Sequence, residues 1–288
     1  GYYALSSNTT AGFNTGIGNA ALQTTTEGHS NTAVGSSALN KVTTGDFNVA
    51  VGYNAGLNMT TGDRSIAIGP ESLDACTTGQ YNVAIGSAAL GSVIDSDSNT
   101  AVGLSTGAAV TTGANNLFLG KDAGITGSPG GNITTGSNEI VLGDENISEA
   151  HIQVDWTVAS DKRDKTDVTP MEMGLDFVNK LEPVTYKWDK RSKYVEKGED
   201  FKELITDGTH KEEWLDTGFL AQDVEVLESE YGYNIADKTN LTTTLSDDGN
   251  QYGLTYSKFV PILVKAVQEL SAEIEELKSQ PKCKCNEE

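Results

Sequence analysis

The sequence predicts a mainly β solenoid with seventeen-residue coils, followed by a smaller α+β domain that ends in a coiled-coil helix. Three observations lead to this expectation: a glycine that recurs at every seventeenth position, an apolar triplet before most of those glycines, and an abrupt rise in charge near residue 160. We expect the solenoid to cover residues 1–159 and the second domain to cover residues 160–288, with the coiled coil at about 256–280.

Glycine recurs at a constant interval through the first half of the chain, at positions 1, 18, 35, 52, 69, 86, 103 and 120. A second series at positions 28, 45, 62, 79 and 113 keeps the same interval, with Ser96 as its one lapse. The last repeat carries six extra residues around 127–131, so the next glycine of the first series is Gly143 and not position 137. Repetition at a fixed period is the signature of stacked structural units.

The triplets predict strands, such as VAV at 49–51 and IAI at 66–68. Because side chains alternate along a strand, the central alanine is expected to face a crowded interior and its β-branched neighbours another packing surface. Glycine then supplies a corner with positive φ, or a close approach of two backbones. A second segment follows, such as SAL at 37–39. We therefore expect two short strands and two turns per coil. Helices are disfavoured, because each interior glycine costs about 1 kcal/mol.

Each coil holds few large apolar side chains, which is little to bury compared with an ordinary core. A core shared by three chains along one axis would stabilise such coils better. This argument predicts a homotrimer.

Charge is distributed very unevenly along the chain. Residues 1–159 contain 16 charged side chains and residues 160–288 contain 45, and the net charge is −21. An acidic surface disfavours nucleic acid and anionic lipid as partners. No run of 18 apolar residues predicts membrane insertion. Nothing in the composition predicts a cofactor.

The NxA(V/I)G unit, as at 48–52, resembles the head repeat of trimeric autotransporter adhesins, and very similar repeats occur in phage tail fibres. The resemblance covers about residues 1–143 and implies a parallel β-roll. Because residues 1–5 (GYYAL) already fit the repeat in register, we expect further coils upstream of Gly1.

The junction between the two halves contains a candidate pair of catalytic residues. Residues 151–159 alternate enough to predict a last strand, and SDKRDKTDV follows at 160–168. That charged run has the composition of a solvated linker. It also places Ser160 five residues before Lys165, close enough to meet across a turn. A serine hydroxyl needs a base to become a nucleophile, and a lysine can serve when burial lowers its pKa.

The signature SDxRxK at 160–165 resembles the start of the intramolecular chaperone auto-processing family, whose domains end phage tailspikes and tail fibres, including endosialidases. Related domains occur in myelin regulatory factor-type proteins. Three later segments fit the family in order: LEPVTYKW at 181–188, GFLAQDVE at 218–225 and YGLTY at 252–256. The resemblance implies cleavage beside the serine, with Ser160 as nucleophile and Lys165 as general base. Asp161, Arg163 and Asp164 would fix the loop by ion pairing.

The scissile bond follows from ring size. Attack by the Ser160 hydroxyl on the carbonyl of Ala159 closes a five-membered ring, whereas attack on its own carbonyl needs a strained four-membered ring. We therefore expect a cut between Ala159 and Ser160. A cut between Ser160 and Asp161 stays open, for example if another chain supplies the nucleophile.

Three other patterns are candidate functional sites: a catalytic triad, two acidic turns and a pair of cysteines. His151 with nearby carboxylates suggests a Ser-His-Asp triad, but no nucleophile-elbow motif surrounds Ser160. The acidic turns at 95–97 and 247–250 hint at calcium, although neither gives a full ligand loop and no metal site is predicted. The second fits a hairpin turn better. Cys283 and Cys285 suit a metal site, a cross-link between chains, or free thiols in an unstructured tail.

The C-terminal helix carries a heptad seam. Its apolar positions step 4-3-4-3-4-3 and are Tyr256, Val260, Leu263, Val267, Leu270, Ile274 and Leu277. Such a seam collects chains into a coiled coil, and an amphipathic core helix is the alternative. Pro261 suits the first turn of this helix.

The two resemblances together imply the distal part of a phage tail fibre or tailspike that attaches to a host glycan or protein receptor. It would be made in the host cytoplasm and carried on the virion. The second domain would gather three chains, set the register of the interchangeable coils and cut itself off as a single-turnover serine peptidase. The alternatives are a bacterial cell-surface trimeric adhesin, or a tailspike whose glycan-degrading domain lies upstream, since no carboxylate pair for glycoside hydrolysis is evident in residues 1–159.

Overall fold

The structure is a computed structural model and describes residues 1–196 and 199–280. Contacts group these residues into two units. The first contains residues 1–150 together with 189–210 and 246–251, and the second contains 151–188, 211–245 and the chain from 252. Cys283 and Cys285 lie outside the described residues.

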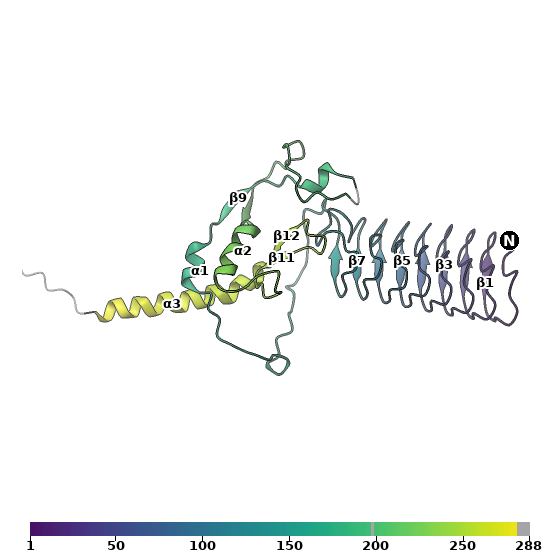
Figure 1. Cartoon of the computed structure of the whole chain (residues 1–288), viewed down its shortest axis with the longest axis horizontal. Helices are drawn as coiled ribbons and strands as arrows, with labels where there is room; N and C mark the ends of the chain where they lie inside the picture. Colours follow the sequence, from purple (N-terminus) through teal and green to yellow (C-terminus); the bar gives the residue numbers. More distant parts are fainter. Residues whose placement is uncertain (197–198, 281–288) are drawn as a thin grey trace, which may run out of the picture. The chain divides into compact units, whose positions relative to one another are not determined.

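The first unit contains the predicted solenoid (Figure 1). One three-residue strand marks each coil, and all neighbouring strands are parallel and in register. From β1 to β7 each residue pairs with its counterpart seventeen positions later, and the step from β7 to β8 is longer by the six inserted residues. The strands are β1 (Thr15–Ile17), β2 (Thr32–Val34), β3 (Val49–Val51), β4 (Ile66–Ile68), β5 (Val83–Ile85), β6 (Thr100–Val102), β7 (Leu117–Leu119) and β8 (Ile140–Leu142).

The interior of each coil is narrow and filled by small or medium side chains. The central alanine of the strand is buried, as predicted, and Leu39 and Val42 of the same coil join Ala33 inside. The third residue of each strand points outward. The result is an aliphatic stripe at one residue per coil, formed by Val51, Ile68, Ile85, Val102 and Leu119, each 37–39% exposed.

The predicted second strand of each coil is absent from the described coils, and this expectation was wrong. Ser37 and Leu39 adopt left-handed conformations, with φ of 58° and 47°, so segment 37–39 is a turn. The segment still pairs with its neighbours, because the Leu39 N–H donates to the Ala55 carbonyl at 3.0 Å. Hydrogen bonds between coils offset the cost of placing leucine where φ is positive.

The strand-end glycines are required by a close approach of backbones. Gly35 has φ of 139°, and a Cβ added there would lie 2.3 Å from the Gly52 carbonyl oxygen of the next coil. In the second series, a Cβ on Gly45 would lie 2.4 Å from the Gly62 oxygen. Both uses of glycine predicted from the period are therefore confirmed.

A ladder of buried polar side chains runs just before the strands. The Asn31 side-chain amide donates to the Gly45 carbonyl at 2.7 Å, and its Oδ1 accepts from the Asn48 N–H at 2.9 Å. Each asparagine thus satisfies backbone groups of its own and the next coil. The ladder positions are Asn14, Asn31, Asn48, Ser65, Asn82, Asn99, Asn116 and, at the C-terminal end, Glu139, whose N–H donates to Asn116.

One coil carries a large residue at the strand position where β2 to β6 carry alanine. Phe118 fills the central position of β7 and is fully buried. Two glycines make room for its ring: a Cβ on Gly107 would lie 2.9 Å from it, and a Cβ on Gly124 would lie 2.4 Å from it. The position equivalent to Gly107 is Leu90 in the preceding coil. The absence of side chains at Gly107 and Gly124 leaves the space that the ring occupies.

The second unit is small and mixes helices with short antiparallel pairs. Its core contains Met173, Phe177, Val224, Phe259 and Ile262. Its elements are the 3-10 turn η1 (Lys162–Asp164), α1 (Leu175–Lys180), β9 (Val184–Tyr186), β10 (Asp216–Gly218), α2 (Ala221–Glu230), β11 (Thr243–Leu245), β12 (Tyr252–Leu254), η3 (Tyr256–Lys258) and α3 (Phe259–Ser279). β9 pairs with β10 and β11 pairs with β12. The helix-to-strand junction near 181–188 and the helix after 252–256 are confirmed.

Residues 151–159 do not form the last strand that their alternation predicts. Residues 152–158 make no hydrogen bond within the described chain. A strand needs a ladder partner, and alternation alone does not provide one. Four apolar side chains are consequently 53–80% exposed, namely Ile152, Val154, Trp156 and Val158.

The terminal helix α3 has two apolar faces. One buries Phe259, Ile262 and Ala266, and the other is the heptad seam, whose members from Val260 to Leu277 are 42–66% exposed. Pro261 lies in the first turn, as predicted. Among the described residues, none of the helices combines the length and apolar character needed to cross a membrane.

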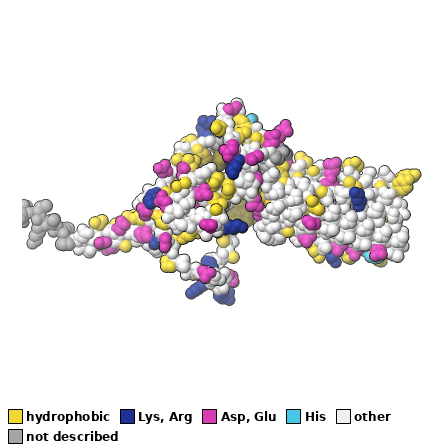
Figure 2. Space-filling view, viewed as in Figure 1, with side chains coloured by type: hydrophobic (Ala, Val, Ile, Leu, Met, Phe, Trp, Pro, Cys, Tyr) yellow, Lys and Arg dark blue, Asp and Glu magenta, His cyan; other side chains and the backbone are white. Residues whose placement is uncertain are grey.

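The two parts also differ at the surface (Figure 2). Uncharged polar side chains and backbone cover most of the visible solenoid, whereas charged side chains are denser over the C-terminal part. This distribution fits the charge contrast found in the sequence.

Replacing Asn99 by alanine should destabilise the solenoid by about 2–4 kcal/mol, because it leaves the Gly113 carbonyl and the Asn116 N–H unpaired. Asn99→Ser is the matched control, since Ser65 already serves in the ladder by accepting from the Asn82 N–H. Denaturant unfolding of the full chain would measure both variants. Equal losses for the two would contradict the assigned role of the ladder.

Gly107→Leu should destabilise the chain, because the new side chain meets the Phe118 ring. Phe118→Ala alone should cost about 3–5 kcal/mol through the cavity it leaves. The double variant should lose clearly less free energy of unfolding than the two single variants added together. The reason is that leucine already occupies the position of Gly107 in other coils, where the strand centre is alanine. A double-mutant cycle of thermal unfolding measures this coupling, and additive losses would exclude it.

Candidate functional site

The candidate site is a short turn that begins at Ser160. Asp161 precedes η1 with extended backbone angles (φ −68°, ψ 131°), and its carboxylate accepts from the Arg163 N–H at 2.9 Å. The aspartate therefore caps the turn by bonding one of its unpaired N–H groups. The Lys165 N–H donates back to the Lys162 carbonyl at 3.3 Å and closes the turn.

This turn brings the two predicted catalytic side chains together. The Lys165 Nζ donates to the Ser160 Oγ at 2.6 Å. The turn η1 reverses the chain between the two residues, which are five positions apart in the sequence. The Lys165 side chain therefore extends across the turn and its Nζ reaches the Ser160 hydroxyl. A nucleophile and a base within hydrogen-bond reach are the geometric requirement of a Ser/Lys pair.

An ion pair stiffens the same turn. The Arg163 Nη2 lies 2.6 Å from the Asp161 Oδ2, and its Nε donates to the same carboxylate. The hydrogen bonds from the Arg163 side chain, followed by that from its backbone, lower the pKa of Asp161 below its usual value. Both groups are solvent-exposed, so the pair positions the loop more than it stabilises the fold.

The pair of Ser160 and Lys165 lies in the open. All side chains from 146 to 170 are exposed in the single chain. Base catalysis needs an uncharged amine, and burial is what disfavours the charged form. The chain alone therefore supplies the contact between the two groups but not the desolvation.

The other predicted residues are placed around this contact. Ala159 lies in the exposed segment just before the turn, and Asp164 ends η1. Within the described residues, Lys165 is the hydrogen-bond partner of Ser160 and His151 is not. The geometry favours the Ser/Lys arrangement over the Ser-His-Asp triad.

The two acidic turns that hinted at calcium have other partners. An Asp97 carboxylate oxygen accepts from the Gln80 N–H at 2.7 Å, which joins two coils. Residues 247–250 form the turn between β11 and β12, as the hairpin interpretation predicts. There Asp248 accepts from Ser246, Asn250 and Asn132.

Sequence reasoning missed the buried carboxylate that supports the second unit. Glu228 of α2 is fully buried and accepts from the Thr242 N–H at 2.6 Å. The Thr242 and Thr243 hydroxyls donate to it as well. This interaction ties α2 to β11. Glu228 looks like an ordinary helical surface residue in the sequence, so no local pattern marks it.

One protein-family model matches the chain, over residues 160–233. The segment resembles the Chaperone of endosialidase family. The match begins at Ser160 and covers about a quarter of the chain. It supports a chaperone role on the C-terminal side of the solenoid, and because this is a peptidase family it is consistent with self-cleavage. No curated protein and no solved structure showed significant similarity to the chain.

Proposed function

We propose that the chain is the C-terminal part of a phage tail fibre or tailspike that assembles as a homotrimer and cleaves itself beside Ser160. The chaperone segment and the helix after it gather three chains and align their solenoids. A single turnover of the Ser/Lys pair then severs the chaperone. One observation carries this proposal: the Lys165 Nζ contacts the Ser160 Oγ at 2.6 Å, at the first residue of the family match.

The chemistry is an N-to-O acyl shift followed by hydrolysis. Neutral Lys165 takes the hydroxyl proton while Ser160 Oγ bonds to the Ala159 carbonyl carbon. The C–N bond to Ser160 then breaks, and its nitrogen takes up a proton to become a free amine. Water hydrolyses the resulting ester, which leaves Ala159 with a carboxylate and Ser160 with its hydroxyl. A cut after Ser160, with the nucleophile from another chain, is the alternative.

Assembly supplies what the single chain lacks at the site. The exposed apolar side chains of 152–158 lie directly before Ser160. When neighbouring copies cover this segment, water is removed around Lys165 and its uncharged form is favoured. Cleavage is therefore coupled to assembly rather than to synthesis.

Two exposed apolar surfaces support association of three copies. The first is the stripe of Val51, Ile68, Ile85, Val102 and Leu119, which the register aligns along the solenoid. The second is the exposed heptad seam of α3. Burying both removes aliphatic surface from water in every coil and along the helix.

Cleavage makes the assembled solenoid persistent. Coils of one period present nearly the same face at each step, so a trimer held at one end is needed to choose a register. Once the clamp is cut away, unfolding cannot retrace the assembly route, and persistence becomes kinetic. A durable rod of this kind suits a virion part that contacts a host receptor, either a glycan or a protein.

Wild-type chain should yield two fragments on a denaturing gel, which correspond to residues 1–159 and 160–288. Ser160→Ala and Lys165→Ala should each leave the chain intact, because one lacks the nucleophile and the other the base. Mass spectrometry of the fragments identifies the broken bond.

Lys162→Ala is the matched control, since Lys162 belongs to the same turn and its side chain does not contact Ser160. It should cleave like wild type. Cleavage that persists in both Ser160→Ala and Lys165→Ala rules out the Ser/Lys pair.

Charges on the helix seam should abolish trimers and cleavage together. Leu263→Asp with Leu270→Asp places carboxylates on the exposed seam, where three copies would repel one another. Gln268→Asp, off the seam on the same helix, should leave both unchanged. Sedimentation measures the oligomer and a gel measures cleavage. Full cleavage by a monomeric seam variant would separate the two events.

A further inference from the structure

The last coil of the solenoid contains an ordered insert that no other described coil has. The insert comprises residues 125–132, which replace the two residues 108–109 of the preceding coil. The buried Ser128 hydroxyl accepts from the Gly124 N–H at 3.0 Å, and the Gly131 N–H donates to the Ser128 carbonyl at 2.9 Å. The insert is therefore a folded turn anchored in the coil.

Two segments from the C-terminal part of the sequence pack within the same unit as this coil. The first arm is residues 189–210, of which 197 and 198 are not described, and it contains the 3-10 turn η2 (Arg191–Tyr194). The second arm is residues 246–251, the turn between β11 and β12. Both arms lie far from the insert in the sequence, so their contacts with it are tertiary.

The second arm contacts the end of the insert through the carboxylate of Asp248. The Asp248 Oδ2 accepts from the Asn132 N–H at 2.9 Å. A Cβ on Gly131 would lie 2.8 Å from the same carboxylate, and the φ of this residue is 75°, so glycine suits the position on both counts. Burial alone would raise the pKa of Asp248, but hydrogen bonds from Ser246, Asn250 and Asn132 outweigh it and lower the pKa below its usual value. The acceptor therefore stays charged at neutral pH.

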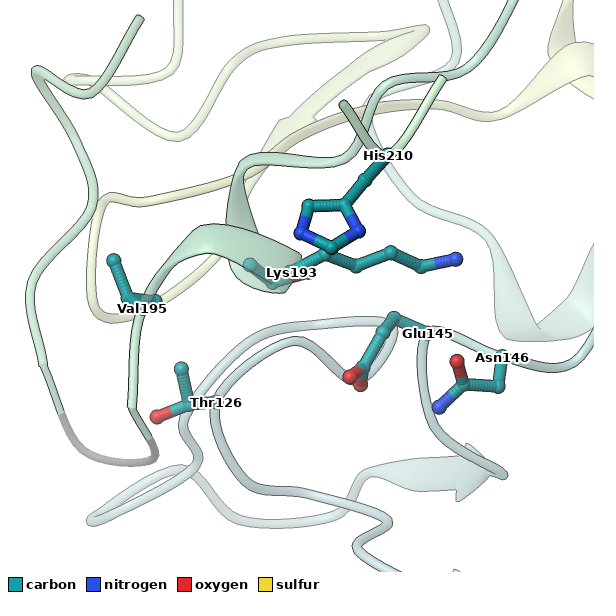
Figure 3. A pocket seen from close by; sticks show the side chains of 7 residues that line it. Thr126, Glu145, Asn146, Lys193, Val195 and His210 are labelled. Atoms are coloured by element: carbon teal, nitrogen blue, oxygen red, sulfur yellow. The ribbon is translucent and has the colours of Figure 1, made fainter. Parts of the chain in front are cut away.

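The first arm approaches the insert and also contacts the segment that follows β8. The Lys190 Nζ donates to the Glu145 carbonyl at 2.6 Å. A Cβ on Gly127 would lie 3.0 Å from the Ser192 side chain, which shows how closely the arm approaches. Residues of the arm and of the last coil line a cavity of about 470 Å³. In Figure 3, Lys193 and His210 of the arm lie opposite Glu145 and Asn146.

The two arms are fastened to each other. The Arg191 guanidinium donates to the Lys202 carbonyl at 2.6 Å in its own arm and also to the Asn250 carbonyl of the second arm. Its cation lies over the ring of Phe201, which is buried. A guanidinium that bridges two loops in this way makes them one recognition surface.

We propose that the insert is the address at which the arms dock, so that the chaperone engages one coil of the solenoid and no other. The inference rests on the proposed chaperone function. Regular coils offer the same backbone at every step, and docking on them would leave the register undefined by any whole number of coils. The insert alone presents the N–H of Asn132 beside glycines that admit the arms, and it thereby marks a single position among the described coils.

Hydrogen exchange of the full chain tests the contact directly. All variants carry Ser160→Ala as well, so that the chain stays uncleaved during the measurement. Asp248→Ala should speed exchange at the Asn132 amide by about tenfold or more and should deprotect residues 246–251. Asp237→Ala, in an exposed turn after α2, is the matched control and should leave Asn132 unchanged. Unchanged exchange at Asn132 in Asp248→Ala would overturn the proposal.

Removal of the address gives a second test. Replacing residues 125–132 by two alanines makes the last coil regular and should deprotect both arms while coils upstream of Gly103 stay protected. Deleting residues 52–68, one complete regular coil, is the control and should leave both arms protected. Arms that stay protected without the insert would show that they dock on any coil.

The same variants distinguish the address from the chaperone function itself. An insert-free chain, with Ser160 restored, that still forms cleaved trimers would refute the address and leave the chaperone function standing. Wild-type chain that forms neither trimers nor fragments, with its arms docked as described, would refute the chaperone function and leave the contact standing.

Discussion

The close approach of backbones between successive coils is the constraint on which the rest of the structure depends. At the strand-end glycines from Gly18 to Gly103 the next coil's carbonyl lies where a side chain would begin, as at Gly35 and Gly52. That spacing allows every coil to hydrogen-bond to its neighbour through strands, left-handed turns and the asparagine ladder alike. It also fixes the length of the repeat, because only residues of equal position meet. An array held in this way is regular and strong, and its coils are nearly interchangeable.

In the proposed trimer, interchangeable coils pose a problem of register. A single stripe of aliphatic side chains, one per coil, would give three chains little means of choosing between registers. Specific polar contacts provide such a choice, and they concentrate where the regular pattern breaks. The bridge from Arg191 to Asn250 and the contact from Asn132 to Asp248 both occur there. The Ser160 turn, by contrast, is built from local bonds alone, so its geometry does not depend on distant parts of the chain.

The sequence predicted the coils well because a fixed period, buried alanines and indispensable glycines are all local signals. It failed where the backbone departs from intrinsic preference: Leu39 adopts a left-handed conformation that only cross-coil hydrogen bonds justify. It also failed at 151–159, where alternation was present without a partner strand. At the site, the five-residue spacing predicted the contact between Ser160 and Lys165. The roles of Glu228 and Asp248 were hidden, because their partners are distant in sequence or belong to the backbone.

The end of the ladder has a consequence for how such a chain changes in length. Glu139 takes the last place in the series and its N–H serves Asn116, but a carboxylate has no hydrogen to offer a further coil. A coil added after Glu139 would therefore lack the side-chain donor that Asn48 gives to the Gly62 carbonyl of the coil below it. An added coil is better hydrogen-bonded when it follows an asparagine of the ladder than when it follows this glutamate.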